Sequence, residues 1–225
     1  MRLRLITLIL LCFWPMTGQK PSAAMQEGPN IQLELDKSKV ARNRPDDKAR
    51  PPATLFGIHC KQINVGKETK FLPDLVLLDQ DSRRVRFYSD LIKDKVVLIS
   101  FFYTSCTYTC QMQGKVFSEL QTEIGERLGK DVFLISVTMD PETDTPERLK
   151  DWAAQHGLRK GWTLVTGSKD EMAKLVGHLT GNPLGRIEMH SPFIYMGNDK
   201  TDNWAVTYGL AAPKKLAKKI EEMRL

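Results

Sequence analysis

Two cysteines four residues apart, Cys106 and Cys110, are the side chains of this sequence best suited to chemistry. They follow Val96 to Phe102, an apolar run rich in β-branched residues that is typical of a buried strand, and they precede a helical pattern. Residues four apart share one face of a helix, so we expect both sulfurs to point at one place near a helix N-terminus, where a thiolate is favoured. Such a pair either binds a soft metal ion or exchanges electrons as a dithiol and disulfide.

The elements around this pair predict an α/β fold. We expect Thr104 or Ser105 to cap the helix that carries the cysteines. The core side of this helix is predicted from apolar spacing: Met112, Val116, Leu120, Ile124 and Leu128. Later strands are expected at Val132 to Thr138, Thr163 to Thr166, Pro192 to Met196 and Trp204 to Thr207, and later helices are expected to open at Thr145-Pro146, Ser168 and Pro213. This order favours a mixed central sheet flanked by helices, with the cysteines where a thioredoxin-like fold places them.

Residues 1–24 have the features of a signal peptide. Arg2 and Arg4 precede an apolar stretch, and Ser22-Ala23-Ala24 offers a cleavage site. Because the stretch is interrupted at Pro15, a short uncleaved anchor is the alternative. We therefore expect an exported protein, either periplasmic or tethered close to the outer face of the inner membrane. Without these residues 30 basic and 27 acidic residues remain, and the formal charge of +6 falls to +3, which gives no case for nucleic acid binding.

The rest of the chain divides into an N-terminal extension and one domain. Residues 25–70 are polar and interrupted by prolines, which is typical of a linker or a loosely ordered lead-in to the domain. Within this range, Leu55 to Val65 is expected to add a strand at the domain edge. Residues 71–225 are long enough for one sizeable core. Cys60 has no partner in the exported chain if the other two cysteines pair, so it is either a small buried residue or a reactive thiol.

A third metal ligand could come from one of four histidines. His156 stands at a predicted helix end, His178 lies among apolar helix residues, and His59 lies in a segment of uncertain structure. His190 ends a polar loop that can return over the cysteine helix. Imidazole is a natural third ligand for Cu(I). Because of the position of its loop, His190 is the best candidate of the four, although the pattern alone leaves its role open.

Four segments follow one another along the chain. The first is Phe101-Phe102-Tyr103-Thr104-Ser105-Cys106-x3-Cys110, and the second is Ile135 to Glu147, which ends in Asp140-Pro141-Glu142-Thr143-Asp144-Thr145-Pro146-Glu147. The third is Gly161-Trp162-Thr163-Leu164-Val165-Thr166-Gly167, and the fourth is His190-Ser191. Together they resemble the signature segments of the Sco/SenC family, the copper proteins named for synthesis of cytochrome c oxidase. The resemblance runs from about Phe71 to Leu225.

The resemblance implies a thioredoxin-like domain that binds one copper ion through Cys106, Cys110 and His190. It implies an assembly factor that delivers copper to, or keeps reduced the cysteines of, the dinuclear copper site in subunit II of cytochrome c oxidase. The implied partners are that subunit or another exported copper protein, and a copper donor protein. Asp140 matches a family acidic residue near the metal, and its alternative role is that of an acidic turn before Pro141.

The sequence also departs from the family pattern. Thr107 and Gln111 stand where the family usually has prolines, and Met189 stands where it often has aspartate, but the three ligands are kept.

An alternative function is a thiol-disulfide oxidoreductase acting on exported proteins, in which Cys106 attacks and Cys110 resolves. A third hypothesis is a copper sensor or store, so whether the protein is an enzyme stays open.

Overall fold

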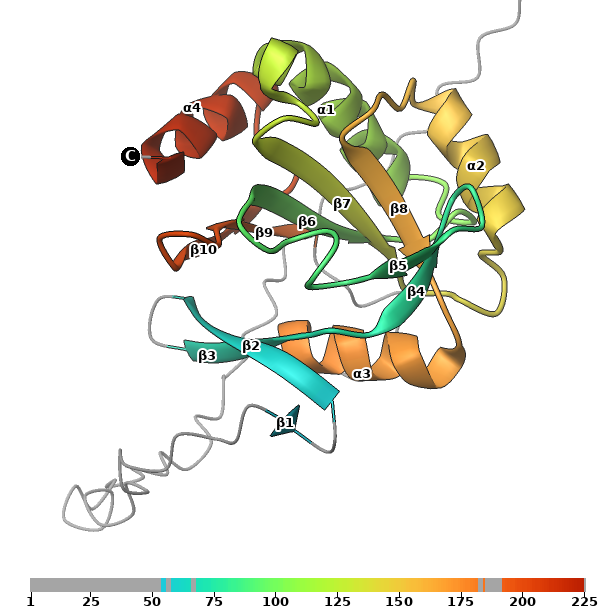
Figure 1. Ribbon diagram of the computed structural model, residues 1–225. Coiled ribbons are helices and arrows are strands. Elements are labelled where there is room, and N and C mark those ends of the chain that lie inside the picture. Colours follow the sequence, from blue (N-terminus) through green and yellow to red (C-terminus); the bar gives the residue numbers. More distant parts are fainter. Residues whose placement is uncertain (1–53, 56–57, 66–67, 182–183, 185–191, 225) are drawn as a thin grey trace, which may run out of the picture. The chain divides into compact units, whose positions relative to one another are not determined.

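The computed structural model describes residues 54–55, 58–65, 68–181, 184 and 192–224. In this part of the chain a mixed sheet lies between helices, which confirms the predicted α/β fold (Figure 1). Its strands are β1 (Thr54–Leu55), β2 (Ile58–Val65), β3 (Glu68–Pro73), β4 (Val76–Asp79), β5 (Arg84–Arg86), β6 (Val96–Phe102), β7 (Val132–Thr138), β8 (Trp162–Thr166), β9 (Phe193–Asn198) and β10 (Asn203–Tyr208). Its helices are α1 (Thr109–Ile124), the short 3-10 helix η1 (Gly125–Arg127), α2 (Pro146–Gln155), α3 (Lys169–Thr180) and α4 (Pro213–Arg224).

Three parallel strands form the centre of the sheet. β6 pairs in parallel with β7, and β7 pairs in parallel with β8. β9 runs antiparallel to β6 on the other side and is followed by β10, while β4 and β5 extend the sheet antiparallel beyond β8. The carboxyl ends of β6 and β7 therefore lie side by side, which in open α/β sheets is where ligands bind.

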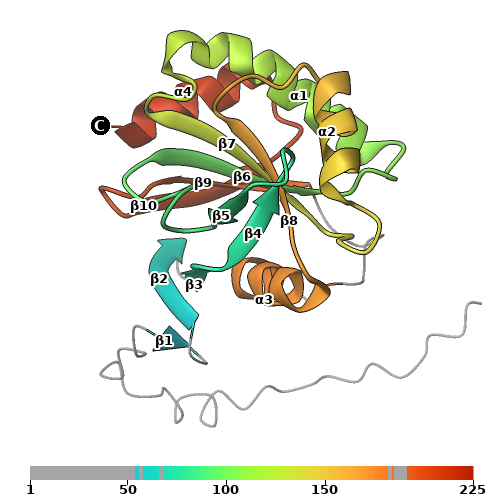
Figure 2. The same ribbon diagram turned by 45° about the vertical axis from the view of Figure 1, so that its right-hand side comes forward.

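Helices cover the two faces of this sheet unequally. Figures 1 and 2 show α1, α2 and α4 on one face and α3 on the other. Each residue of β6 is buried, because Leu98 and Phe102 pack with α1, α2 and α4, while Val97, Ile99 and Phe101 pack with the core on the α3 side. A continuous apolar strand is the expected consequence of burial on both faces.

Two strands precede residue 71 and still belong to the sheet. β2 lies where an edge strand was expected, pairs with β3 from Cys60 to Val65, and meets β10 at Val65 and Trp204. The predicted leader, residues 1–24, lies outside the described residues. None of the helices in the described part of the chain is long and apolar enough to span a membrane.

Candidate metal centre

The cysteine pair lies in the connection from β6 to α1. The peptide N–H of Met139, which directly follows β7, donates to the Phe102 carbonyl at 2.7 Å, so this connection starts beside the end of β7. Cys106 lies in a turn in which its N–H donates to the Tyr103 carbonyl at 3.2 Å. α1 begins only at Thr109, with Tyr108 as its N-cap residue and no side-chain cap.

The structure brings the two cysteines together, although not in the predicted way. Cys106 precedes the helix and Cys110 lies in its first turn, so the expectation that both lie on one helix face is wrong. The peptide N–H of Cys110 nevertheless donates to Cys106 Sγ at 3.3 Å. Both residues are thiols rather than a disulfide, with 9% of Cys106 and 1% of Cys110 exposed.

The two thiols have opposite acidities. Burial raises the pKa of Cys106, but hydrogen bonds from the Cys110 side chain and from the backbone of Cys110 and Tyr108 together outweigh it, so the pKa lies below its ordinary value. Burial and the hydrogen bond to Cys106 raise the pKa of Cys110 to about 12, and the charges of Cys106 and Asp144 add to this. Cys106 is therefore the more acidic thiol of the pair and Cys110 the less acidic one.

A buried carboxylate, Asp144, fixes the start of the cysteine turn. It accepts hydrogen bonds from the Thr104 N–H at 3.1 and 3.2 Å, from the Thr104 hydroxyl, and from the Thr138 hydroxyl at 2.5 Å. Arg148 donates to the same Thr104 hydroxyl from Nε at 3.3 Å and from Nη2 at 3.2 Å. The end of β7 and the start of α2 thus hold the backbone two residues before Cys106.

Sequence reasoning selected Asp140 and missed Asp144. Asp140 is only half-buried, and its backbone carbonyl accepts the Asp144 N–H at 2.8 Å, so it shapes the turn that places Asp144. The signal was present in the second aspartate of Asp140-Pro141-Glu142-Thr143-Asp144, but its burial depends on contacts far away in sequence.

One departure from the family pattern has a structural consequence. The Gln111 side chain donates from Nε2 to the Cys106 carbonyl at 3.2 Å, a contact that proline lacks the donor to make. Thr107 is exposed. Gln111 therefore closes the cysteine turn onto α1.

The described histidines lie in other contacts. The His156 ring stacks on Trp152 with centroids 3.8 Å apart, and its Nδ1 lies 2.9 Å from the Trp152 carbonyl oxygen. His178 Nδ1 lies 2.5 Å from the Lys174 carbonyl oxygen. His190 and the His59 side chain lie outside the described residues. In the described part of the chain, no three His, Cys, Asp or Glu residues form a group that could hold a metal ion.

Comparison with known proteins assigns the chain to a family. The family profile described as SCO1/SenC matches residues 65–223, most of the sequence. The chain belongs to the SCO1/SenC family. The SCO1 protein homolog of Bacillus subtilis (strain 168) is 34% identical to this SCO1/SenC protein over 91 residues, 40% of this chain and 45% of the homolog. The chain spans about half the length of this and of another relative that it matches.

Solved structures of the family share the fold of this SCO1/SenC protein. BsSco, described as a member of the Sco family of cytochrome c oxidase assembly proteins, matches with a TM-score of 0.59 and 22% identity, over 72% of this chain and 98% of BsSco. Bradyrhizobium japonicum ScoI with copper bound matches with a TM-score of 0.54 and 23% identity, over 66% of this chain and 96% of ScoI. At these identities the likeness supports the thioredoxin-like Sco fold.

Proposed function

We propose that this SCO1/SenC protein binds one copper ion through Cys106, Cys110 and His190. It then delivers copper to, or maintains the thiols of, the dinuclear copper site of cytochrome c oxidase. The observation that carries this proposal is the contact between the two cysteines at the end of β6, where the Cys110 N–H donates to Cys106 Sγ at 3.3 Å. Two sulfur ligands select a soft ion such as Cu(I), and a family member has been solved with copper bound.

The position of Pro192 supports His190 as the third ligand. The Pro192 carbonyl accepts the Gly209 N–H at 2.5 Å. A side chain at Gly209 would collide with Gln113 in α1, so Pro192 is held close to the first two turns of that helix. His190 is two residues earlier, and two residues of extended chain span up to about 7 Å.

Copper loading couples to protonation of this pair. Cys106 offers a thiolate first, because hydrogen bonds lower its pKa despite burial. Cys110, with its pKa raised to about 12 by burial, must release its proton to become a ligand. We therefore expect Cu(I) binding to release a proton and to weaken as the pH falls.

The same acidities favour a second function, thiol-disulfide exchange. The Cys106 thiolate would attack a partner disulfide and form a mixed disulfide, and Cys110 would then lose its proton and displace the partner. The pair becomes a disulfide, giving up two electrons and two protons, and the partner gains two thiols. The opposite pKa shifts suit an attacking and a resolving cysteine.

Cu(I) titration against a competing chelator tests the copper proposal. Wild-type protein should bind one Cu(I), and Cys106→Ser, Cys110→Ser and His190→Ala should each lose stoichiometric binding. His178→Ala is the matched control and should bind normally. Unchanged copper affinity in His190→Ala would refute the three-ligand site.

A second experiment separates metal delivery from thiol reduction. The copper-loaded and the reduced copper-free protein are incubated separately with a soluble oxidase subunit II domain. Copper appearing in that domain supports delivery, and new thiols without copper support reduction. No transfer of either kind points to a copper sensor or store.

The proposed function also requires export through residues 1–24. We propose that these residues direct the protein to the periplasm or tether it to the outer face of the inner membrane. Cell fractionation with mass analysis of the mature N-terminus tests this, and recovery of full-length protein from the cytoplasm would contradict it.

A further inference from the structure

We propose that an exposed apolar patch beside the cysteines, bordered by lysines, docks the acidic surface of a partner protein. This inference rests on the proposed function, because it names the chemistry of the protein that exchanges copper or electrons with the pair. The apolar patch consists of Tyr108, Met112, Phe193, Val206 and Tyr208. The lysine rim consists of Lys115, Lys214 and Lys215.

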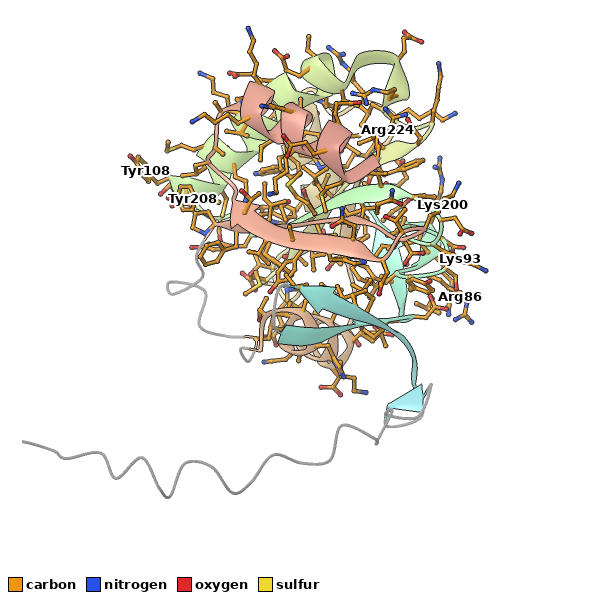
Figure 3. All side chains as sticks on the ribbon, turned by 90° about the vertical axis from the view of Figure 1, so that its left-hand side faces the viewer. Arg86, Lys93, Tyr108, Lys200, Tyr208 and Arg224 are labelled. Atoms are coloured by element: carbon orange, nitrogen blue, oxygen red, sulfur yellow. The ribbon has the colours of Figure 1, made fainter. Side chains whose placement is uncertain are left out.

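The apolar patch collects the large apolar side chains that are exposed. Within the described residues, all five such side chains belong to it, with Tyr108 73% and Tyr208 52% exposed. Figure 3 shows Tyr108 and Tyr208 on the same side of the molecule. The Phe193 and Tyr208 rings form an edge-to-face pair with centroids 6.5 Å apart. Exposed apolar residues are normally scattered, and their collection at one place marks an interaction site.

Backbone contacts place the two halves of the patch beside the thiols. Tyr108 lies between Cys106 and Cys110 in sequence, and Met112 is in the first turn of α1. The other half lies at the start of β9 and the end of β10, joined by the hydrogen bond from the Gly209 N–H to the Pro192 carbonyl. A Cβ on Gly209 would collide with the Gln113 side chain, so this end of the hairpin lies against α1.

The segments around the patch carry charge of one sign. Residues 103–116, 192–195 and 205–220 contain five lysines and no acidic residue, although the whole chain has 27 acidic residues. The ion pairs in the described part of the chain include none of Lys115, Lys214 and Lys215. Figure 3 places the start of α4 above Tyr208, opposite the end that carries Arg224.

The position of the lysines indicates that they serve an interaction. Lys214 and Lys215 lie in the first turn of α4, which has no acidic residue. Positive charge there is unfavourable, because the helix dipole is itself positive at the N-terminus. An acidic partner would neutralise both lysines and the dipole. A protein is favoured over a lipid surface because the patch adjoins two thiols, and only a protein supplies the sulfur or imidazole groups that receive copper or electrons.

Fluorescence anisotropy of labelled peptides on the reduced, metal-free, full-length protein tests the docking surface. Two peptides share a central segment with leucine and tryptophan, which is flanked by glutamates in one and by lysines in the other. The acidic peptide should bind roughly tenfold more tightly at low salt. This preference should shrink at 0.15 M salt, where the screening length falls to about 8 Å.

Charge reversal locates the surface. Lys214→Glu with Lys215→Glu should weaken acidic-peptide binding roughly five- to tenfold. The matched control is Lys93→Glu with Lys200→Glu, which makes the same charge change at exposed positions on the opposite side (Figure 3) and should change binding less than about twofold. Tyr208→Ser should weaken both peptides equally at every salt concentration.

Equal binding of the two peptides at low salt would overturn the proposal, as would equal losses of acidic-peptide binding in the two double variants. Two other occupants are also tested on the wild type. Cosedimentation with phosphatidylglycerol vesicles that is lost in Lys214→Glu with Lys215→Glu, without peptide discrimination, would assign the surface to a membrane. Sedimentation velocity showing a dimer that the same variant abolishes would assign it to a second copy. Because the protein is metal-free, failure of copper binding in the titration leaves these results unaffected, and the reverse also holds.

Discussion

Replacing Asp144 with alanine removes the acceptor that holds the cysteine turn to β7. The carboxylate is fully buried and accepts hydrogen bonds from the Thr104 N–H, the Thr104 hydroxyl and the Thr138 hydroxyl. Thr138 is also fully buried, so its hydroxyl loses a partner that water does not replace. Thr104 is half-buried and keeps its contact with Arg148, so its loss is smaller.

The cost follows from these three donors. A buried donor left without an acceptor costs about 1–3 kcal/mol, and hydrogen bonds to charged groups lie at the upper end. For Asp144→Ala we therefore expect the free energy of unfolding to fall by about 3–5 kcal/mol. A domain with a typical stability of about 5–15 kcal/mol would still fold. Asp144→Asn keeps one oxygen acceptor and should cost about 1–3 kcal/mol.

Urea unfolding of the reduced protein measures this loss, and alkylation of Cys106 reports whether the turn has loosened. Asp140→Ala is the matched control, because it removes the same group from a half-buried position in the same turn. The control should lose less than about 1 kcal/mol. If Asp144→Ala is no less stable than Asp140→Ala, the carboxylate does not hold the turn and the argument fails.

Three further predictions concern the thiols and the packing of α1. Iodoacetamide near pH 7 should alkylate Cys106 well before Cys110. Hydrogen bonds outweigh burial and lower the pKa of Cys106, whereas burial raises the pKa of Cys110 to about 12. Equal labelling of the two cysteines in peptide mass maps would contradict this prediction. The native state keeps the Cys110 proton that the unfolded state releases from a pKa of 9.0, so between pH 9 and 12 the free energy of unfolding should fall by up to about 1.4 kcal/mol per pH unit. Cys110→Ala should remove this part of the pH dependence in urea titrations. Gly114→Ala should destabilise the protein by about 1–3 kcal/mol despite the better helix propensity of alanine, since its Cβ would overlap the His156 ring and lie 2.8 Å from Trp152; adding His156→Ala should recover part of the loss.

Elements with local signals could be predicted from the sequence. Val96 to Phe102 was expected as a strand and is β6 with the same bounds. Thr145 caps α2 with Pro146 at its first position, and Ser168 forms a capping box with Glu171 at the start of α3. In each case the residues that define the boundary are neighbours in sequence.

The start of α1 could not be predicted in this way. Thr104 or Ser105 was expected to cap the helix, but Asp144 and Arg148 bind the Thr104 hydroxyl, and the helix begins at Thr109 with Tyr108 as its N-cap residue. The core face of α1 also differs from the prediction: Met112, expected in the core, is exposed, and Gln113 is buried. A contact between residues 40 positions apart, which no local pattern contains, decides this boundary.

The candidate site shows the same division between local and distant causes. The spacing of Cys106 and Cys110 predicted that both sulfurs would point at one place, and in the structure the two side chains are hydrogen-bonded to each other. The spacing does not predict that the two thiols differ in acidity. In the folded protein, hydrogen bonds lower the pKa of Cys106, and burial together with the hydrogen bond to Cys106 raises the pKa of Cys110. This inequality affects both proposed reactions, because it sets which sulfur attacks a disulfide and which must release a proton before it binds copper. His190 as a ligand stays a prediction, and its test is the copper titration rather than the sequence pattern.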